Sequence, residues 1–230
     1  MSKRSEFANE SGVQKSLRRR LQNALFAGLY RFGGRVYDPL TRFLFGGAWD
    51  RWRASVIPFL PSGGHVLDLG CGTGALVDRL NIMGYVAFGI DREPSMLRRV
   101  QSYPGARSRI IRGDAGLLPF CSASFDACVA TFPSRFVVEA TTLDEVSRVL
   151  RPGGTFAVVL SGYTDDWPLK RRPIRLALRL FYGERDSQRL PESSLIAHPA
   201  LTGEWRWLSH GQDHVLVWIG IREAKSESAS

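Results

Sequence analysis

The segment from Val66 to Gly74 reads VLDLGCGTG, and it restricts the possible folds of this chain more than any other segment. Its first half is typical of the end of a buried strand, and three glycines then follow at alternate positions. Apolar residues continue at helical spacing from Ala75 onward. Glycine allows a tight turn whose backbone a ligand can approach closely. The order of strand, bare turn and helix is typical of α/β proteins that bind a nucleotide-like ligand.

The chain after this turn alternates between apolar runs and amphipathic stretches, which predicts strands separated by helices. The predicted strands are 65–69, 86–91, 108–113, 125–131 and 155–160, and the predicted helices are 75–83, 94–103 and 143–150. We interpret the residues from Arg151 to Gly154 as the turn that closes the last of these helices. Such an order favours a parallel sheet covered on both faces, with a ligand crevice at the carboxyl ends of the strands.

Two further apolar runs, 204–208 and 214–222, predict a hairpin that completes the sheet. The expected fold class is therefore α/β: a Rossmann-like, seven-stranded, mostly parallel sheet with helices on both faces, an antiparallel last strand and an N-terminal helical cap. The expected organisation is a basic helical arm or cap over residues 1–60, a main domain over 61–222 with an insertion or lid at 163–200, and a disordered tail at 223–230.

Positive charge is concentrated in two segments of this chain of 230 residues and net charge +9. Residues 1–60 hold eleven cations and four acids, and residues 163–190 hold seven cations in a pattern that predicts a basic amphipathic helix. This helix is either a lid over the crevice or a peripheral contact with an anionic membrane, and the two readings stay open. Three cysteines without metal-site spacing indicate no metal centre and a reducing, cytoplasmic location. No apolar run approaches the ~20 residues of a membrane helix.

Five ordered segments carry a resemblance to one family. They are VLDLGCGTG (66–74), FGIDREPSML (88–97), GDAGLLPF (113–120), SFDACVATFPSRFV (124–137) and EVSRVLRPGGTFAVVL (145–160). In order and spacing they resemble the motifs of class I S-adenosylmethionine-dependent methyltransferases, of the small-molecule branch that includes the ubiquinone and menaquinone biosynthesis enzymes. The resemblance implies S-adenosylmethionine as cofactor and in-line methyl transfer to a small, apolar or lipid-like acceptor.

The resemblance also implies roles for three acidic residues that follow or end strands. Asp68 would hold the amino group of the cofactor, and Asp91 would accept hydrogen bonds from both ribose hydroxyls. Asp114 and the amide of Ala115 would contact the adenine, while Thr131 would face the methyl donor or the acceptor. The complete expected set is Asp68, Gly70, Cys71, Gly72, Thr73, Gly74, Asp91, Arg92, Met96, Asp114, Ala115 and Thr131.

Other functions remain as alternatives at this point. The glycine turn also satisfies the dinucleotide pattern GxGxxG/A, although Asp68 would place a negative charge beside a pyrophosphate. Ala130 to Ser134 lacks the Asn/Asp-Pro-Pro-aromatic tetrad of base N-methylating enzymes, so nucleic acid is disfavoured as a partner, with RNA methylation kept as the runner-up. A non-catalytic cofactor-binding scaffold is the third reading. No residue is assigned as a catalytic base, and His198, His210 and His214 are expected to be structural or exposed.

Overall fold

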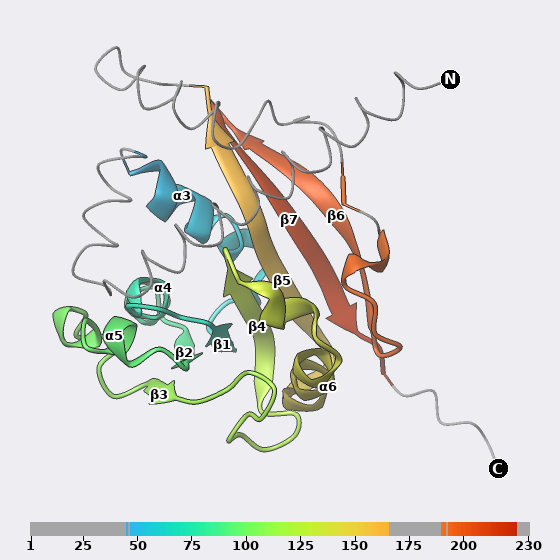
Figure 1. Cartoon of the computed structure of the whole chain (residues 1–230), viewed down its shortest axis with the longest axis horizontal. Helices are drawn as coiled ribbons and strands as arrows, with labels where there is room; N and C mark the ends of the chain where they lie inside the picture. Colours follow the sequence, from blue (N-terminus) through green and yellow to red (C-terminus); the bar gives the residue numbers. More distant parts are fainter. Residues whose placement is uncertain (1–44, 46, 166–189, 192, 225–230) are drawn as a thin grey trace, which may run out of the picture.

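Seven strands form one sheet in the order β3-β2-β1-β4-β5-β7-β6 (Figure 1). The structure is a computed structural model that describes residues 45, 47–165, 190–191 and 193–224. The helices lie on both faces of the sheet, α3, α4 and α5 on one side and α6 on the other (Figure 1). This architecture confirms the predicted fold class, since all neighbouring strands from β3 to β5 pair in parallel.

The central strands have the predicted bounds. They are β1 (His65–Leu69), β2 (Val86–Asp91) and β4 (Phe125–Thr131). Helix α4 (Ala75–Ile82) follows β1 and ends one residue before the predicted end. Asp68 lies opposite Gly89 of β2 and Val129 of β4, so β1 is flanked on both sides. Continuous apolar runs identify these strands because both of their faces are buried.

The region between β2 and β4 differs from the expected helix at 94–103 and strand at 108–113. The helix is split into α5 (Pro94–Leu97) and the 3-10 turn η2 (Val100–Ser102). Tyr103 is extended because it precedes Pro104, and this ends the helical run. Strand β3 covers only Ile110–Arg112, the residues that pair with Gly89 to Asp91 of β2.

Strand β5 (Leu150–Thr164) is much longer than the predicted 155–160. The expected turn from Arg151 to Gly154 is wrong, since Leu150 pairs with Phe125 while Thr155 pairs with Ala127. The residues between them form a bulge within the strand. At its other end β5 continues past the parallel sheet, and Thr164 pairs with Asp213 of β7. The two residues 163 and 164, expected in the insertion, therefore belong to β5.

The carboxyl-terminal hairpin consists of β6 (Leu201–His210) and β7 (Asp213–Arg222). β7 pairs antiparallel with both β5 and β6, which confirms the antiparallel last strand. Helix α6 (Ala140–Val149) begins three residues before the predicted start and packs on the opposite face from α4. The short elements α3 (Ala48–Ala54), η1 (Ile57–Phe59), η3 (Arg135–Val138) and η5 (Ser193–Leu195) complete the described structure.

The two faces of the sheet carry separate apolar cores. Leu67 and Leu69 of β1 pack in the core that includes α6, whereas Val66 packs in the core that includes α3 and α4. Because side chains alternate along a strand, Asp68 points to the same face as Val66. The sequence therefore places this acid on the side of the sheet that α3 covers.

Several predicted segments fall outside the described residues. They are most of the arm at 1–60, the basic segment from 166 to 189 within the insertion, and residues 225–230 of the tail. The domain boundaries stay predictions. Within the described part of the chain, no helix has the length and apolarity required to cross a membrane.

Candidate functional site

The glycine turn joins β1 to α4 and is tied to the neighbouring strand. The N–H groups of Gly70 and Cys71 both donate to the carbonyl oxygen of Ile90, at 2.8 and 3.1 Å. Gly74 is the N-cap of α4 with φ +84°, and a Cβ there would lie 2.5 Å from Ile110 Cδ1. Left-handed backbone and close packing together require glycine at this position.

Gly72, in the middle of the turn, presents bare backbone to open space. Its φ is +58°, and a Cβ built on it would meet no atom within 4 Å. Its N–H donates to Asp91 Oδ2 at 2.8 Å. A ligand can therefore lie against this part of the turn without displacing a side chain.

Asp91 ends β2 beside the turn. Its Oδ2 accepts from Gly72 and its Oδ1 accepts from the N–H of Glu93 at 2.8 Å. Burial raises the pKa of Asp91, and these two backbone hydrogen bonds oppose the shift. Each carboxylate oxygen has a second acceptor direction, so this side chain can still accept two ligand hydroxyls.

Asp68 is the most unusual group at this edge of the sheet. It is 1% exposed, and its Oδ1 has no hydrogen-bond partner among the described residues. Burial raises its pKa to about 8; the positive charge of Arg53 opposes this shift and the negative charge of Asp91 adds to it. A buried carboxylate without a partner is costly, and a ligand cation would satisfy it. These acceptor groups therefore fit a ligand that carries an ammonium group and two adjacent hydroxyls.

Asp114 and Ala115 reach the same edge of the sheet after β3. The N–H of Gly113 donates to the carbonyl oxygen of Asp91 at 3.1 Å, which places this loop beside the end of β2. Asp114 Oδ1 accepts from Gly116 N–H at 2.8 Å. The side chain of Asp114 thus caps its own turn, and Ala115 is half-buried behind it.

The remaining predicted residues surround this group. Met96 of α5 is 2% exposed and Arg92 is exposed after β2. Thr73 is 2% exposed within the glycine turn, and Thr131 ends β4 half-buried. The structure thus brings the turn, Asp68, Asp91 and the loop of Asp114 to the carboxyl edge of adjacent strands.

The surroundings of Cys71 disfavour a nucleophile, and His214 and His198 each contact an acidic side chain. Burial and the nearby acids Asp68 and Asp91 raise the pKa of the Cys71 thiol well above its usual value, which disfavours the reactive thiolate. His214 stacks on Tyr163 at 4.6 Å and lies 3.1 Å from Asp165. His198 contacts Asp144 at 3.1 Å and adjoins the start of β6, at the opposite end of the sheet.

The sequence did not predict that three further residues lie near this edge of the sheet. They are Trp49 and Arg53 of α3 and Phe132, which follows β4. Arg53 lies within electrostatic range of Asp68, and Trp49 stacks on Phe132 with ring centroids 3.9 Å apart. Phe132 has φ +51°, an uncommon conformation for a residue with a side chain. The helical spacing of Trp49 and Trp52 indicated a buried stripe, but no sequence signal distinguished Arg53 from the other cations of the first sixty residues.

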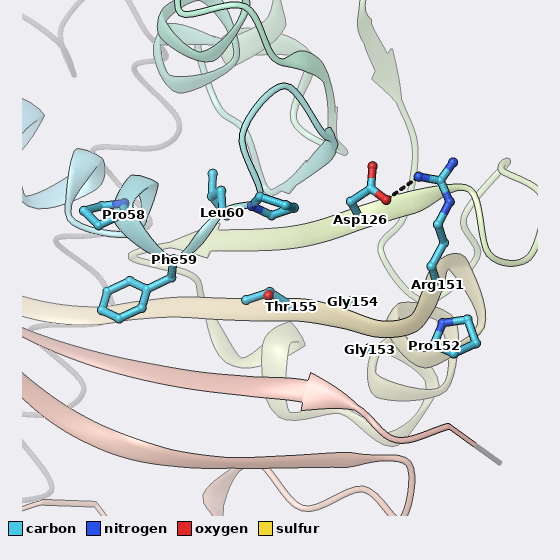
Figure 2. Close-up of a pocket in the computed structure, with 10 residues that line it drawn as sticks. Pro58, Phe59, Leu60, Asp126, Arg151, Pro152, Gly153, Gly154 and Thr155 are labelled. Atoms are coloured by element: carbon cyan, nitrogen blue, oxygen red, sulfur yellow. Dashed lines mark hydrogen bonds and ion pairs between the residues drawn. The ribbon is translucent and has the colours of Figure 1, made fainter. Parts of the chain in front are cut away.

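A hollow of about 420 Å³ lies at the end of the strands opposite the glycine turn (Figure 2). It is lined by η1, the following loop and the bulge of β5, and its charged groups are the paired Asp126 and Arg151 (Figure 2). These two side chains neutralise one another. The hollow therefore offers no unsatisfied group comparable with Asp68.

Known proteins resemble this chain over the same elements. Residues 67–158 match the family described as methyltransferase domain. The chain is 35% identical over 133 residues to a demethylmenaquinone methyltransferase of Symbiobacterium thermophilum, covering 52% of each protein. It is 32% identical over 199 residues to a demethylmenaquinone methyltransferase of Thermobifida fusca, covering 80% of this chain and 84% of that one.

A sterol-methylating relative and a solved structure extend the comparison. A sterol 24-C-methyltransferase of Gibberella zeae is 33% identical over 192 residues, covering 72% of this chain and 47% of that one. The match therefore spans about half the length of the Symbiobacterium and Gibberella relatives. A solved S-adenosyl-L-methionine-dependent methyltransferase structure from Methanococcus maripaludis shares the fold with TM-score 0.58 at 18% identity, covering 85% of this chain and 94% of that one.

Proposed function

The chain belongs to the class I S-adenosylmethionine-dependent methyltransferases, and from this premise we propose that it methylates a small, apolar, lipid-like acceptor. The observation that carries the proposal is the juxtaposition, at one edge of the sheet, of the bare turn at Gly72 with the carboxylates of Asp68 and Asp91. These groups match the ammonium and ribose hydroxyls of the family's cofactor in chemistry and order.

The residues of this chain would bind and orient rather than form covalent bonds. Asp91 would accept from the ribose hydroxyls and Asp68 would hold the ammonium. Met96 and the loop of Asp114 and Ala115 would pack around the adenine. When bound, S-adenosylmethionine supplies a methyl group already activated by its sulfonium. The protein then needs to align two molecules and exclude water.

Thr131 and the aromatic stack after it adjoin this edge and are proposed to border the acceptor. The half-buried Trp49–Phe132 pair gives the end of β4 an apolar surface. Such a surface suits an apolar acceptor better than a charged one. The names of the relatives support the same class, because they specify a quinone precursor and a sterol as substrates.

We test this proposal by calorimetric titration of the purified full chain with S-adenosylhomocysteine, followed by methyl transfer from radiolabelled S-adenosylmethionine. Detergent-solubilised demethylmenaquinone, a sterol and bulk RNA are the acceptors. Binding of the nucleoside together with label in the quinone or sterol fraction is the expected result. Label in RNA would overturn the acceptor class, and binding without any transfer would favour a scaffold. Failure to bind the nucleoside would overturn the assignment of the site.

Peripheral contact with an anionic membrane is part of this proposal, because an apolar acceptor resides in lipid. The sequence from Lys170 to Arg189 supports it through seven cations interspersed with apolar residues. Charge reversal at Arg171, Arg172, Arg175 and Arg179 is expected to reduce flotation with vesicles containing phosphatidylglycerol. Equal flotation of the variant and the parent protein would leave these arginines as residues of a lid.

A further inference from the structure

The loop of residues 113–124 joins β3 to β4, and two side chains of helix α6 hold its backbone. The N–H of Leu118 donates to Glu145 Oε2 at 2.6 Å. In the other direction, the guanidinium of Arg148 donates to the carbonyl oxygens of Leu118, at 3.0 Å, and Phe120, at 2.7 Å. Three hydrogen bonds therefore tie the middle of this loop to α6.

Glu145 and Arg148 are also fixed to one another. Arg148 Nε donates to Glu145 Oε1 at 2.6 Å, and Arg148 Nη2 donates to Glu145 Oε2 at 2.8 Å. Their side chains are 17% and 34% exposed. A guanidinium and a carboxylate joined by two bonds share one plane, which restricts both side chains to one geometry. The pair therefore presents donors and an acceptor to the loop in fixed positions.

The first half of the same loop rests on α6 and carries Asp114. A Cβ built on Gly116 would lie 3.1 Å from Thr141 Oγ1 of α6, and Leu118 is 5% exposed. Asp114 Oδ1 accepts from the N–H of Gly116 at 2.8 Å, and the carbonyl oxygen of Asp114 accepts from the N–H of Leu117 at 3.1 Å. The position of Asp114 therefore follows from that of the residues that α6 holds.

We propose that Glu145 and Arg148 are positioning residues for cofactor selectivity. They hold the loop so that the second carboxylate oxygen of Asp114, Oδ2, accepts from the exocyclic amino group of adenine. This inference rests on the proposed function, which supplies the adenine. A hydrogen bond weakens steeply when its distance and angle depart from the optimum, so selectivity for an amino group requires a fixed acceptor. The two residues act through the loop, and their effect is therefore on recognition of the base.

The test separates recognition of the base from binding of the rest of the ligand. Calorimetry on the purified full chain measures S-adenosylhomocysteine and S-inosylhomocysteine, in which a carbonyl replaces the exocyclic amino group. The parent protein is expected to bind S-adenosylhomocysteine at least about tenfold more tightly, because a charged hydrogen bond is lost with the analogue. Arg148→Ala is expected to lower the affinity for S-adenosylhomocysteine about tenfold and that for S-inosylhomocysteine less than about threefold.

Two substitutions at Glu145 and one control sharpen this test. Glu145→Ala is expected to reduce the preference for adenine as Arg148→Ala does. Glu145→Gln keeps an oxygen that can accept from the N–H of Leu118, so it is expected to lower the affinity for S-adenosylhomocysteine less than about threefold. Asp144→Asn, which removes a 3.1 Å contact of the same helix with His198, is the matched control. It is expected to change neither affinity more than about twofold.

Each result bears on a different claim. Equal affinity of the parent protein for the two nucleosides would overturn the inference, and this measurement does not depend on whether any variant folds. An Arg148→Ala variant that is folded by circular dichroism and keeps the parent preference, or loses both ligands equally, would also overturn it. Lack of binding of both nucleosides by the parent protein would instead overturn the proposed function itself.

Discussion

The two ends of the sheet each hold an aspartate on a central strand, and these residues are in opposite states. Asp68, near the carboxyl end of β1, is buried, lacks a partner for one oxygen and has a pKa raised to about 8, chiefly by burial. Asp126, near the amino end of β4, pairs with Arg151 (Figure 2). It also accepts from the N–H of His65 at 2.8 Å. Burial alone would raise the pKa of Asp126, but these bonds lower it. An unsatisfied acid beside a bare turn indicates binding, whereas a satisfied one indicates structure.

Both ends also contain a glycine with positive φ and open space where a Cβ would be. These are Gly72 in the turn after β1, at φ +58°, and Gly153 in the bulge of β5, at φ +77°. Their local geometry is alike, and only their neighbours differ. The same substitution at both glycines therefore distinguishes the cost of backbone strain, which both variants share, from the loss of a binding surface, which is expected only at Gly72.

The largest expected effect is that of Gly72→Val. Its side chain would occupy the space proposed for the ligand, so S-adenosylhomocysteine affinity is expected to fall more than about 100-fold, or about 2.7 kcal/mol. Gly153→Val is the control. Each variant carries a left-handed residue that costs about 1–2 kcal/mol, so each should lower the Tm by about 2–8 °C. Equal ligand affinity in the two variants would contradict the proposal that the ligand lies against Gly72.

A smaller loss is expected for Asp91→Ala. Removal of charged hydrogen bonds is expected to weaken S-adenosylhomocysteine binding by about 1.5–3 kcal/mol, which is about tenfold to 150-fold. Asp126→Ala removes a partly exposed ion pair and is expected to leave this affinity unchanged within about twofold. Calorimetry on both variants measures the difference, and an unchanged affinity in Asp91→Ala would contradict the role of Asp91.

Asp68 and Asp126 are also expected to contribute to stability, with opposite dependence on pH. Asp68 keeps its proton in the folded state up to about pH 8, whereas the unfolded carboxyl releases it near pH 4. Its contribution to the free energy of unfolding is therefore fully present below about pH 4 and is lost as the pH rises toward 8. Asp126 has a lowered pKa, so its contribution is present above about pH 4 and is lost as the pH falls through the folded value.

Urea unfolding from pH 3 to pH 9 measures both effects. Asp68→Asn is expected to gain stability relative to the parent protein as the pH rises from 5 to 8. Asp126→Asn is expected to be less stable than the parent protein at pH 7 and to approach it near pH 3. Parallel curves for Asp68→Asn and the parent protein would show that the pKa of Asp68 is the same in the folded and unfolded states, which would contradict the rise caused by burial.

The elements that sequence predicted best are those whose signal is local. β1, β2 and β4 have their predicted bounds because strands buried on both faces are continuous apolar runs. The bulge of β5 was read as a turn, because Pro152-Gly153-Gly154 has turn composition and only pairing with β4 and β7 shows that the strand continues. The length of β3 likewise depends on how many of its residues pair with β2.

The sequence by itself determined the glycine turn, the acids at the strand ends and the alternation of strand and helix, because backbone conformation and side-chain periodicity are properties of neighbours in the chain. Only the tertiary structure decided that Arg53 of α3 lies within electrostatic range of Asp68 and that Trp49 stacks on Phe132. Both arrangements depend on how α3, which lies outside the motifs, packs against β5, β7 and the residue that follows β4. Burial then sets the charge state of Asp68, and burial is a property of the whole fold.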